Sequence, residues 1–398
     1  MKPVYFFLAI LGLASGKKNI TITDPDFSLL SNETYWKEWK PPIPSKTIWR
    51  TENRKILRNN EPFYIKGVNL NGIESNCIAP LGLWDNTIAY YLDFMQDNKF
   101  NSLRLPVSYE VMADLNKPIG QCVNADHNLR GGMPVGDLIQ YILDESMKRK
   151  IYVLVDLHTI GGTITPDPWT SSVSEEMVIT AWVNFMIRFG KHPALFAIEI
   201  KNEPHGLISM NEFTTHCAKV IYNIMNNVPE YQGLFVISGV EYHGSAWGGS
   251  FGSDKPSSSF QGLDHPNGLC LVGLVDRYVL NPHVYGTSVR GEGVIWEAHK
   301  ENPAWESFYG FLSESDSHWR NAVILVTEYG GFMKEGSTDR AYYEAWLKWH
   351  LGKGYTAGGY HWTFNGEFSG DTGGLIEKGK VNDYKVDFCN RLTPNPSF

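Results

Sequence analysis

The sequence lacks long apolar segments and blocks of basic residues. Beyond its N-terminus, no stretch reaches the roughly 20 apolar residues that a membrane-spanning helix needs. With 35 Lys and Arg against 43 Asp and Glu, the formal net charge is -8, and no cluster of cations stands ready to neutralise phosphates. We therefore expect neither a membrane nor a nucleic acid as a partner.

Cysteine is also scarce, and it follows no regular motif. The five cysteines have neither the CxxC nor the Cys/His spacing of a zinc site, so we expect no metal and no other cofactor. In an oxidising compartment some of them can pair, and the odd count leaves at least one free. The connectivity is open at this stage; the residues are Cys77, Cys122, Cys217, Cys270 and Cys389.

The first 16 residues have the pattern of a signal peptide. Lys2 precedes an apolar run from Val4 to Leu13, and small residues follow it before Lys17. The run is too short to cross a bilayer core of about 30 Å. We therefore expect a secreted, extracellular protein. Residues 17–48 include a proline-rich stretch that is unsuited to regular structure, so we interpret them as an N-terminal extension.

From residue 49 onward, short apolar runs alternate with helical patterns, which is typical of a parallel sheet. We predict a monomer with one catalytic domain over residues 49–398, folded as a (β/α)8 TIM barrel. The link from Glu241 to Arg277 is rich in Gly and Ser and shows no helical pattern, so we predict a loop on the barrel rim. The predicted strands are Phe63–Asn69, Ser102–Pro106, Ile151–Asp156, Phe196–Lys201, Leu234–Gly239, Tyr278–Pro282, Ala322–Thr327 and Gly358–Thr363. The predicted helices are Thr87–Asn98, Pro134–Arg149, Val173–Phe189, Ser209–Asn226, Pro303–Ser317 and Asp339–Leu351.

Polar residues occupy the ends of most of these strands, where a TIM barrel carries its reacting groups. Two of them, Glu203 and Glu328, end strands four and seven on opposite sides of the barrel. Glycoside hydrolysis needs one acid to protonate the leaving oxygen and a second carboxylate to attack or to activate water. A separation of about 5–5.5 Å predicts retention of configuration, and about 6.5–9.5 Å predicts inversion. The full set of residues that we expect at this end of the barrel is Arg104, His158, Asn202, Glu203, His283, Tyr285, Glu328 and Trp362.

Each of these residues also has a purely structural interpretation. A single Glu at a strand end is more often a surface ion-pair partner, and a buried His or a turn-capping Asn is common. Arg104 lies inside an apolar strand, where an unpaired guanidinium is costly, so it must pair with a carboxylate. We expect that partner to be Glu328, because a nucleophilic carboxylate has to be ionised.

The run Asn202-Glu203-Pro204 and the later run Thr327-Glu328-Tyr329-Gly330 resemble glycoside hydrolase family 5, the largest cellulase family. That family carries an Arg, a His, an Asn-Glu pair, a His-x-Tyr, a Glu and a Trp in this order, and all of them are present here. Residues 60–380 are similar to its bacterial-type endo-β-1,4-glucanases. That similarity is carried by Lys66-Gly67-Val68-Asn69, Gly82-Leu83-Trp84, Ala246-Trp247-Gly248-Gly249 and Ser369-Gly370-Asp371-Thr372-Gly373-Gly374.

One departure follows His158. Such relatives often have a Cys there that bridges back to the first loop, so Cys77 is expected to lack that partner. The catalytic set is complete, but the sugar subsite nearest this loop is expected to differ in shape.

The resemblance implies a metal-free double displacement that retains configuration and cleaves β-1,4-glucan. Glu203 would act as acid and then as base, and Glu328 would attack. Glu203 must then be protonated while Glu328 is ionised, so we expect a bell-shaped rate profile with an acidic optimum.

The remaining residues would bind the sugars or orient the two glutamates. Asn202 would bind the sugar 2-hydroxyl, and Tyr285 would donate to Glu328. His283 would contact the acid or the leaving sugar, and His158 a neighbouring hydroxyl. Trp362 would form the floor beneath the sugar at the cleavage point, and the candidates for further stacking platforms are Trp247, Trp84 and Trp169.

Two alternatives stay open. The same residues also serve a β-mannanase, β-1,3-glucanase, xyloglucanase or glycolipid glycanase, because specificity lies in the loops. A barrel that binds carbohydrate without cleaving it is the second alternative.

Overall fold

The computed structural model describes residues 20–25, 48–205, 208–240, 247–251, 276–291, 304–314, 319–365 and 372–398. The predicted signal peptide, most of the predicted N-terminal extension and most of the Glu241–Arg277 link lie outside these residues.

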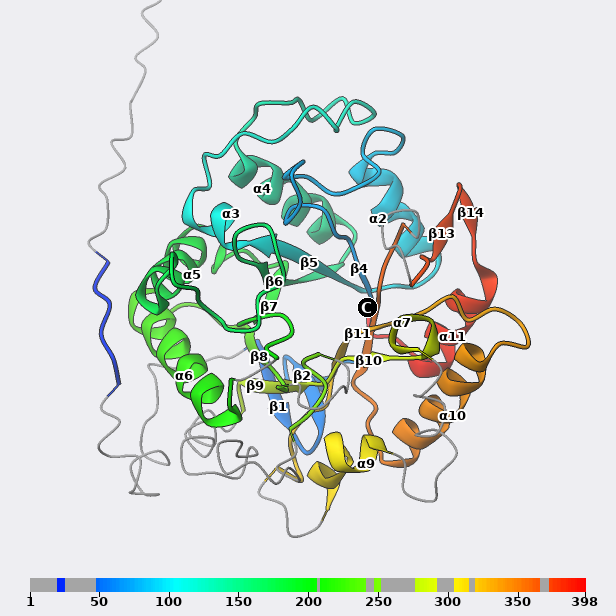
Figure 1. Ribbon diagram of the computed structural model, residues 1–398. Helices are drawn as coiled ribbons and strands as arrows, with labels where there is room; N and C mark the ends of the chain where they lie inside the picture. Colours follow the sequence, from blue (N-terminus) through cyan, green and yellow to red (C-terminus); the bar gives the residue numbers. More distant parts are fainter. Residues whose placement is uncertain are drawn as a thin grey trace, which may run out of the picture.

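A closed barrel of parallel strands forms the centre of the molecule (Figure 1). The strand order is β10-β11-β12-β4-β5-β6-β7-β8-β9, and every neighbouring pair is parallel. The first and last of these strands are two halves of one segment, and a bridge from Leu280 to Ile324 closes the ring. The predicted (β/α)8 barrel is therefore confirmed. The strands are β4 (Ile65–Asn69), β5 (Ser102–Ser108), β6 (Tyr152–Thr159), β7 (Leu195–Glu199), β8 (Leu234–Ser238), β9 (Tyr278–Asn281), β10 (Val284–Tyr285), β11 (Val326–Gly330) and β12 (Gly358–His361).

Strand seven begins later than predicted. The apolar run of residues 322–325 is buried, but the regular ladder starts at Val326, which pairs with Gly359 of β12. Glu328 therefore lies within a strand rather than after it, and the longer β6 likewise contains His158.

Helices cover the outside of the barrel, and most of them begin where the sequence predicts. Four of the five long helices have a hydroxyl side chain at the N-cap, as the preference of Ser and Thr for this position leads one to expect, whereas α4 follows Pro134 without a side-chain cap. Thr87, Ser174, Ser209 and Ser337 each accept a hydrogen bond from a backbone N–H of the first turn. The long helices are α2 (Ile88–Asp97), α4 (Val135–Lys148), α5 (Glu175–Phe189), α6 (Met210–Asn227) and α10 (Thr338–Gly352).

Other helices were shortened or missed. Within the described residues 304–314, the predicted helix Pro303–Ser317 consists of α9 (Ala304–Phe308), followed by the 3-10 turn η4 (Gly310–Ser313). At Gly310 an added Cβ would meet the side chains of Trp349 and Glu306, so the glycine lets η4 pack closely against α10. The sequence did not predict α3 (Tyr109–Ala113), α7 (Thr287–Arg290) and α11 (Asp383–Leu392).

A small antiparallel sheet lies at the N-terminal end of the barrel, and it was also missed. Its strands are β1 (Trp49–Glu52), β2 (Lys55–Arg58) and β3 (Glu61–Pro62). Trp49 packs its ring within about 5 Å of those of Phe63, Tyr152 and Phe196, which fills this end with aromatic side chains. The reacting groups are consequently confined to the opposite end. A two-stranded hairpin, β13 (Ile376–Glu377) and β14 (Lys380–Val381), precedes α11.

Cys77 and Cys122 form a disulfide, so Cys77 does have a partner, although not the one at the loop after His158. Sequence spacing alone did not reveal that these two loops meet, with Cα atoms 6.4 Å apart. Cys217 and Cys389 are buried and take no part in this disulfide, and Cys270 lies outside the described residues.

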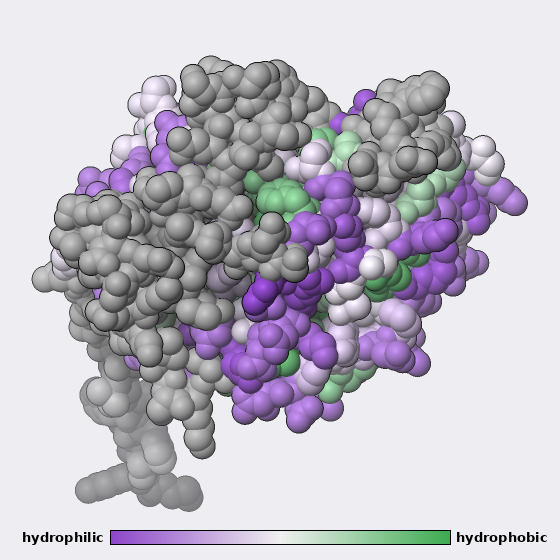
Figure 2. All heavy atoms as spheres, turned by 90° about the horizontal axis from the view of Figure 1, so that it is seen from below, coloured by the Kyte–Doolittle hydropathy of each residue, from purple (hydrophilic) through white to green (hydrophobic). Residues whose placement is uncertain are grey.

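The described part of the chain holds no helix that is both long and apolar enough to cross a membrane. Among the described residues that are visible in Figure 2, hydrophilic residues predominate and apolar residues gather in small patches. The short segment 20–25 runs beside α6, where Asn223 both accepts from the backbone N–H of Thr23 and donates to its carbonyl.

Candidate active site

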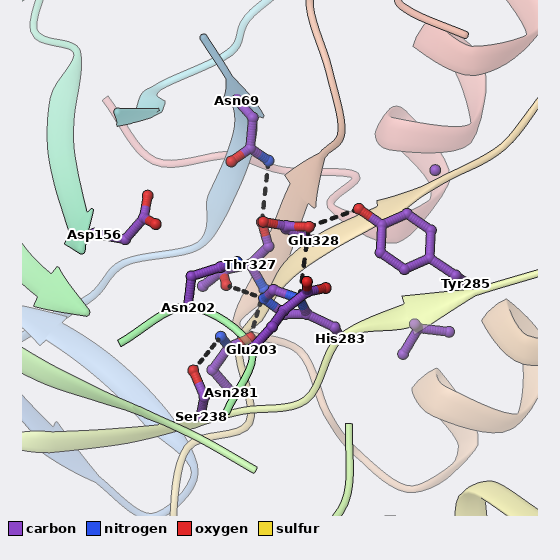
Figure 3. A network of polar contacts seen from close by, with 12 residues as sticks. Asn69, Asp156, Asn202, Glu203, Ser238, Asn281, His283, Tyr285, Thr327 and Glu328 are labelled. Atoms are coloured by element: carbon purple, nitrogen blue, oxygen red, sulfur yellow. Dashed lines mark hydrogen bonds and ion pairs between the residues drawn. The ribbon is translucent and has the colours of Figure 1, made fainter. Parts of the chain in front are cut away.

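The barrel brings the eight predicted strand-end residues to one end of the molecule. Seven of them are buried, and Trp362 is half-buried. They lie in β5 (Arg104), β6 (His158), the turn after β7 (Asn202, Glu203), the β9–β10 junction and β10 (His283, Tyr285), β11 (Glu328) and the turn after β12 (Trp362). Figure 3 shows Glu203, Glu328, His283 and Tyr285 in one polar network.

Both oxygens of Glu328 are held by hydrogen bonds. Arg104 Nη1 donates to Oε1 at 2.6 Å, which is the pairing expected from the sequence, and the Tyr285 hydroxyl donates to Oε2 at 2.6 Å. Burial alone would raise the pKa of Glu328, but the charges of His283, Arg104 and His158, with the Tyr285 hydrogen bond, outweigh it and lower the pKa to about 2. Glu328 is therefore ionised across the ordinary pH range.

Glu203 faces Glu328 across His283. Its Oε1 lies 2.9 Å from His283 Nδ1, which in turn lies 3.5 Å from Glu328 Oε2. Glu203 has a positive φ of 46°, a left-handed conformation in which non-glycine residues store strain, often at functional sites. One carboxylate oxygen of Glu203 and one of Glu328 lie within 4.8 Å of each other.

His283 serves both carboxylates. Burial alone would lower its pKa, but the charge of Glu328 and the hydrogen bond and charge of Glu203 raise it. Its second ring nitrogen, Nε2, lies 3.2 Å from Thr327 Oγ1. An imidazole in this position can hold a positive charge between two carboxylates while their protonation changes.

Glu203, His283 and Glu328 are also close enough together to hold a metal ion. Their donors are already used, however: Glu328 accepts from Arg104 and Tyr285, and the His283 nitrogens contact Glu203 and Thr327. The adjacent guanidinium also repels a cation. The arrangement therefore suits proton transfer better than metal binding.

Arg104 has more partners than the sequence suggested. Besides Glu328 it contacts Glu199, Asp156, Asn69 and Asn202. The sequence could have indicated these further partners. A fully buried guanidinium needs acceptors for five N–H groups, and one carboxylate supplies too few.

Among the described residues, only the amide oxygen of the Asn202 side chain has a hydrogen-bond partner. Its Oδ1 accepts from Arg104 Nη2 at 2.9 Å, whereas its Nδ2 is buried without a hydrogen-bond partner among the described residues. An unsatisfied buried donor is costly, and at a functional site it is a candidate contact for a ligand.

His158 and Trp362 form a stacked pair with ring centroids 5.3 Å apart and planes 5° from parallel. Asp156 Oδ2 lies 2.8 Å from His158 Nδ1. Burial alone would lower the pKa of His158, but the Asp156 carboxylate outweighs it and raises the pKa to about 9. The site therefore has a cationic ring beside its half-buried indole.

The other predicted platforms differ in exposure. Trp247 is 45% exposed and stacks on His205 at 4.1 Å, with the planes 6° apart. His205 Nδ1 is 2.6 Å from the carbonyl oxygen of Glu203, so this exposed indole is connected to the glutamate through one residue. Trp84 is half-buried, and Trp169 is half-buried with its ring 5.3 Å from that of His216.

A surface groove of about 420 Å³ lies elsewhere, between α3 and α5. Its lining includes Tyr109, Glu176 and Met177 but none of the predicted site residues. With a single carboxylate and no partner acid, it does not offer the same chemistry.

The model of the cellulase family, glycosyl hydrolase family 5, matches residues 58–366, a range that contains every predicted site residue. The chain is 25% identical over 348 residues to an endoglucanase of Paenibacillus polymyxa, covering 83% of each chain. It is 26% identical over 330 residues to the major extracellular endoglucanase of Xanthomonas campestris pv. campestris, covering 78% of this chain and 63% of that protein.

Solved structures have the same fold. The catalytic domain of the Xanthomonas campestris enzyme superimposes with a TM-score of 0.74 at 22% identity, covering 87% of this chain and 100% of that one. A complex of the Pyrococcus horikoshii endocellulase with cellotetraose gives a TM-score of 0.72 at 22% identity, with 88% and 99% covered.

Proposed function

Because the chain belongs to glycosyl hydrolase family 5, the cellulase family, we propose that it cleaves β-1,4-glucosidic bonds within cellulose or related β-glucans with retention of configuration. The spacing of the two carboxylates carries this proposal. An oxygen–oxygen separation within 4.8 Å is close to the roughly 5–5.5 Å of retaining enzymes and shorter than the roughly 6.5–9.5 Å of inverting ones.

Glu328 is the nucleophile in this proposal. It is ionised, and its two oxygens are oriented by Arg104 and Tyr285. It attacks the anomeric carbon while Glu203 gives its proton to the departing oxygen, which leaves a glycosyl ester on Glu328. Glu203, now ionised, takes a proton from water, and the water oxygen displaces Glu328 with a second inversion.

His283 supports the change of Glu203 from acid to base. When Glu203 loses its proton, the adjacent imidazole supplies a compensating charge or hydrogen bond at 2.9 Å. When Glu328 becomes an ester and loses its charge, the same ring remains beside it at 3.5 Å. The ring thus limits the electrostatic cost of each step.

The sugar at the cleavage point would lie on Trp362, beside His158. Asn202 Nδ2, which lacks a partner among the described residues, is available to the 2-hydroxyl, where contacts tighten in an oxocarbenium-like transition state. Trp247, connected through His205 to Glu203, suits a sugar on the leaving side. Trp84 is a further candidate platform.

We also propose that residues 1–16 are a signal peptide and that the mature enzyme is extracellular. A matched relative is named as an extracellular endoglucanase. We further propose that the enzyme is a monomer, that its substrate is a polysaccharide, and that it binds neither nucleic acid nor a membrane.

A panel of soluble polysaccharides tests this function. On carboxymethylcellulose, viscosity should fall well before most reducing ends appear, as internal cleavage requires. Cleavage of mannan, laminarin or xyloglucan alone would remove the substrate assignment and leave the mechanism. Binding of glucan without any release of reducing ends would contradict the enzyme assignment itself.

A further inference from the structure

A third carboxylate, Glu199, lies beneath the two candidate catalytic glutamates. It is the last residue of β7, is fully buried, and precedes Glu203 by four positions. Its Oε2 accepts from Arg104 Nε and its Oε1 from Arg104 Nη2, both at 3.0 Å. This two-point fork is the strongest geometry available to an arginine and a carboxylate.

The fork determines what the rest of Arg104 can do. Its Nη1 donates to Asn69 at 2.9 Å and to Glu328 at 2.6 Å, and the other N–H of Nη2 donates to Asn202 at 2.9 Å. Five hydrogen bonds thus use the five N–H groups of the guanidinium. Because the group is planar, fixing the edge that faces Glu199 also fixes the edge that faces Glu328.

Glu199 is itself held by neighbouring strands. Its Oε1 accepts from Asn281 Nδ2 at 3.1 Å and from Ser238 Oγ at 3.2 Å. Figure 3 shows the contact between Asn281 and Ser238 close to Glu203 and Thr327. Asn281 Oδ1 accepts at 2.8 Å from the backbone N–H of Thr327, the residue before Glu328. Glu199 is thus connected to Glu328 through Arg104 and also through Asn281.

Several carboxylates also share the positive charge of Arg104. Burial alone would lower the pKa of Arg104, but Asp156, Glu199 and Glu328 outweigh it and raise the pKa well above its usual range. One guanidinium charge therefore serves several carboxylates. Without the charge of Glu199, Arg104 would attract the electrons of Glu328 more strongly, and a more stabilised carboxylate is a weaker nucleophile.

We propose that Glu199 is a positioning residue of the reaction, one that fixes Arg104 through its fork and shares its charge so that Glu328 stays oriented and nucleophilic. The inference rests on the proposed function, because it assigns Glu328 the attack. Glu199 itself touches no substrate in this account.

Glu199→Gln tests the proposal, because it keeps the shape and removes the charge. We expect a kcat about 10- to 100-fold lower on 4-nitrophenyl β-cellobioside, where attack by Glu328 limits the rate, with KM within about twofold. On 2,4-dinitrophenyl β-cellobioside, where release from Glu328 limits the rate, we expect a much smaller loss, because a less basic carboxylate leaves more easily. The acid limb of kcat/KM should also move to lower pH.

The matched control is Glu344→Gln. Glu344 forms a similar two-point fork with Arg391, at 2.8 Å for both bonds, between α10 and α11 and outside the proposed catalytic machinery. The Glu344→Gln variant should have kcat and KM values near those of the wild type on both substrates. Equal kcat values for Glu199→Gln and this control would overturn the proposal. Equal slowing of Glu199→Gln on both substrates would overturn it as well, because a purely structural defect acts that way.

Circular dichroism establishes that each variant is folded. Should Glu199→Gln not fold, Ser238→Ala carries the test, because it removes the Ser238 hydrogen bond to Glu199, with the contacts of the same hydroxyl to Asn281 and the Lys201 carbonyl, and removes no charge. We then expect kcat about two- to fivefold lower with unchanged KM, and an unchanged kcat would overturn the positioning role. The wild type is measured in parallel, so that failure of the Glu199 proposal can be told from failure of the proposed function. A wild type that cleaves neither cellobioside nor any glucan would contradict the proposed function.

Discussion

The hydroxyl of Tyr285 donates a 2.6 Å hydrogen bond to Oε2 of Glu328, while Arg104 holds the other oxygen of that carboxylate. Burial and the charge of Glu328 raise the pKa of Tyr285 well above its usual range, so the phenol remains a donor throughout the working pH range. A carboxylate held at both oxygens loses little rotational freedom when it attacks.

Tyr285→Phe should therefore lower kcat by about 10- to 100-fold and change KM little, because it removes orientation without removing a sugar contact. Steady-state kinetics on an aryl β-cellobioside measure both constants. Tyr384→Phe is the control, since the Tyr384 hydroxyl also donates at 2.6 Å to a glutamate, Glu344, away from the site. Equal kinetics for the two variants would count against the assigned role.

The pH dependence of stability should show a maximum near pH 6.5. Burial lowers the pKa of His350 to about 3, so only the unfolded chain binds that proton, and stability falls as the pH drops below the ordinary value of 6.5. Burial alone would lower the pKa of His158, but Asp156 raises it to about 9, so its contribution is complete below pH 6.5 and lost as the pH rises toward 9. Below pH 4.5, protonation of Glu328 in the unfolded chain adds to the loss, since its folded-state pKa is about 2.

Thermal denaturation between pH 4 and 9 measures this profile. His350→Leu removes the buried imidazole and should make the acid side less steep, with the Glu328 contribution retained, while leaving the alkaline side unchanged. A maximum at pH 8 or above, or an acid side insensitive to His350→Leu, would contradict the assignment.

The parts predicted from sequence were those with a local pattern. The cap residues Thr87 and Ser209 precede apolar periodicity, and the helices they begin lie within two residues of their predicted bounds. Glu203 and Glu328 stood out because each follows or ends an apolar run. A barrel places all such positions at one end, so the candidate site followed from the fold.

The parts that were missed depend on contacts between distant segments. Nothing near Cys77 in the sequence indicates that its loop meets the loop of Cys122. Glu199 resembled any residue of an apolar strand, and its importance appears only when Arg104 approaches from β5. The strands β1–β3 are short, and the aromatic packing of Trp49 that stabilises them is not visible as a periodic pattern.

Trp247→Ala should raise KM on soluble glucan by about tenfold and leave kcat within about twofold. Stacking on an aromatic ring contributes about 0.5–1.5 kcal/mol between aromatic pairs, we take the upper end of that range for a sugar on this indole, and tenfold in affinity corresponds to about 1.4 kcal/mol. Tyr90→Ala is the control, because Tyr90 is 40% exposed, similar to Trp247, but lies on α2 outside the barrel. An unchanged KM in Trp247→Ala would remove this residue from the binding cleft.

Loss of the Cys77–Cys122 disulfide should destabilise the enzyme without abolishing its chemistry. The bridge spans 45 residues, and closing a loop of that size contributes up to about 4 kcal/mol by constraining the unfolded chain. The Cys77→Ser/Cys122→Ser variant should unfold at a lower urea concentration. Peptide mapping without reductant should find the two cysteines linked in the wild type, and finding both as free thiols would contradict the pairing.

The most direct test of the central claim identifies the nucleophile chemically. Glu203→Ala and Glu328→Ala should each lose at least about 10³-fold in kcat on carboxymethylcellulose. With an activated aryl β-cellobioside and azide, Glu328→Ala should yield a cellobiosyl azide of inverted configuration, and Glu203→Ala one of retained configuration. Exchanged configurations would reverse the two roles, and full activity in either variant would contradict the two-glutamate mechanism.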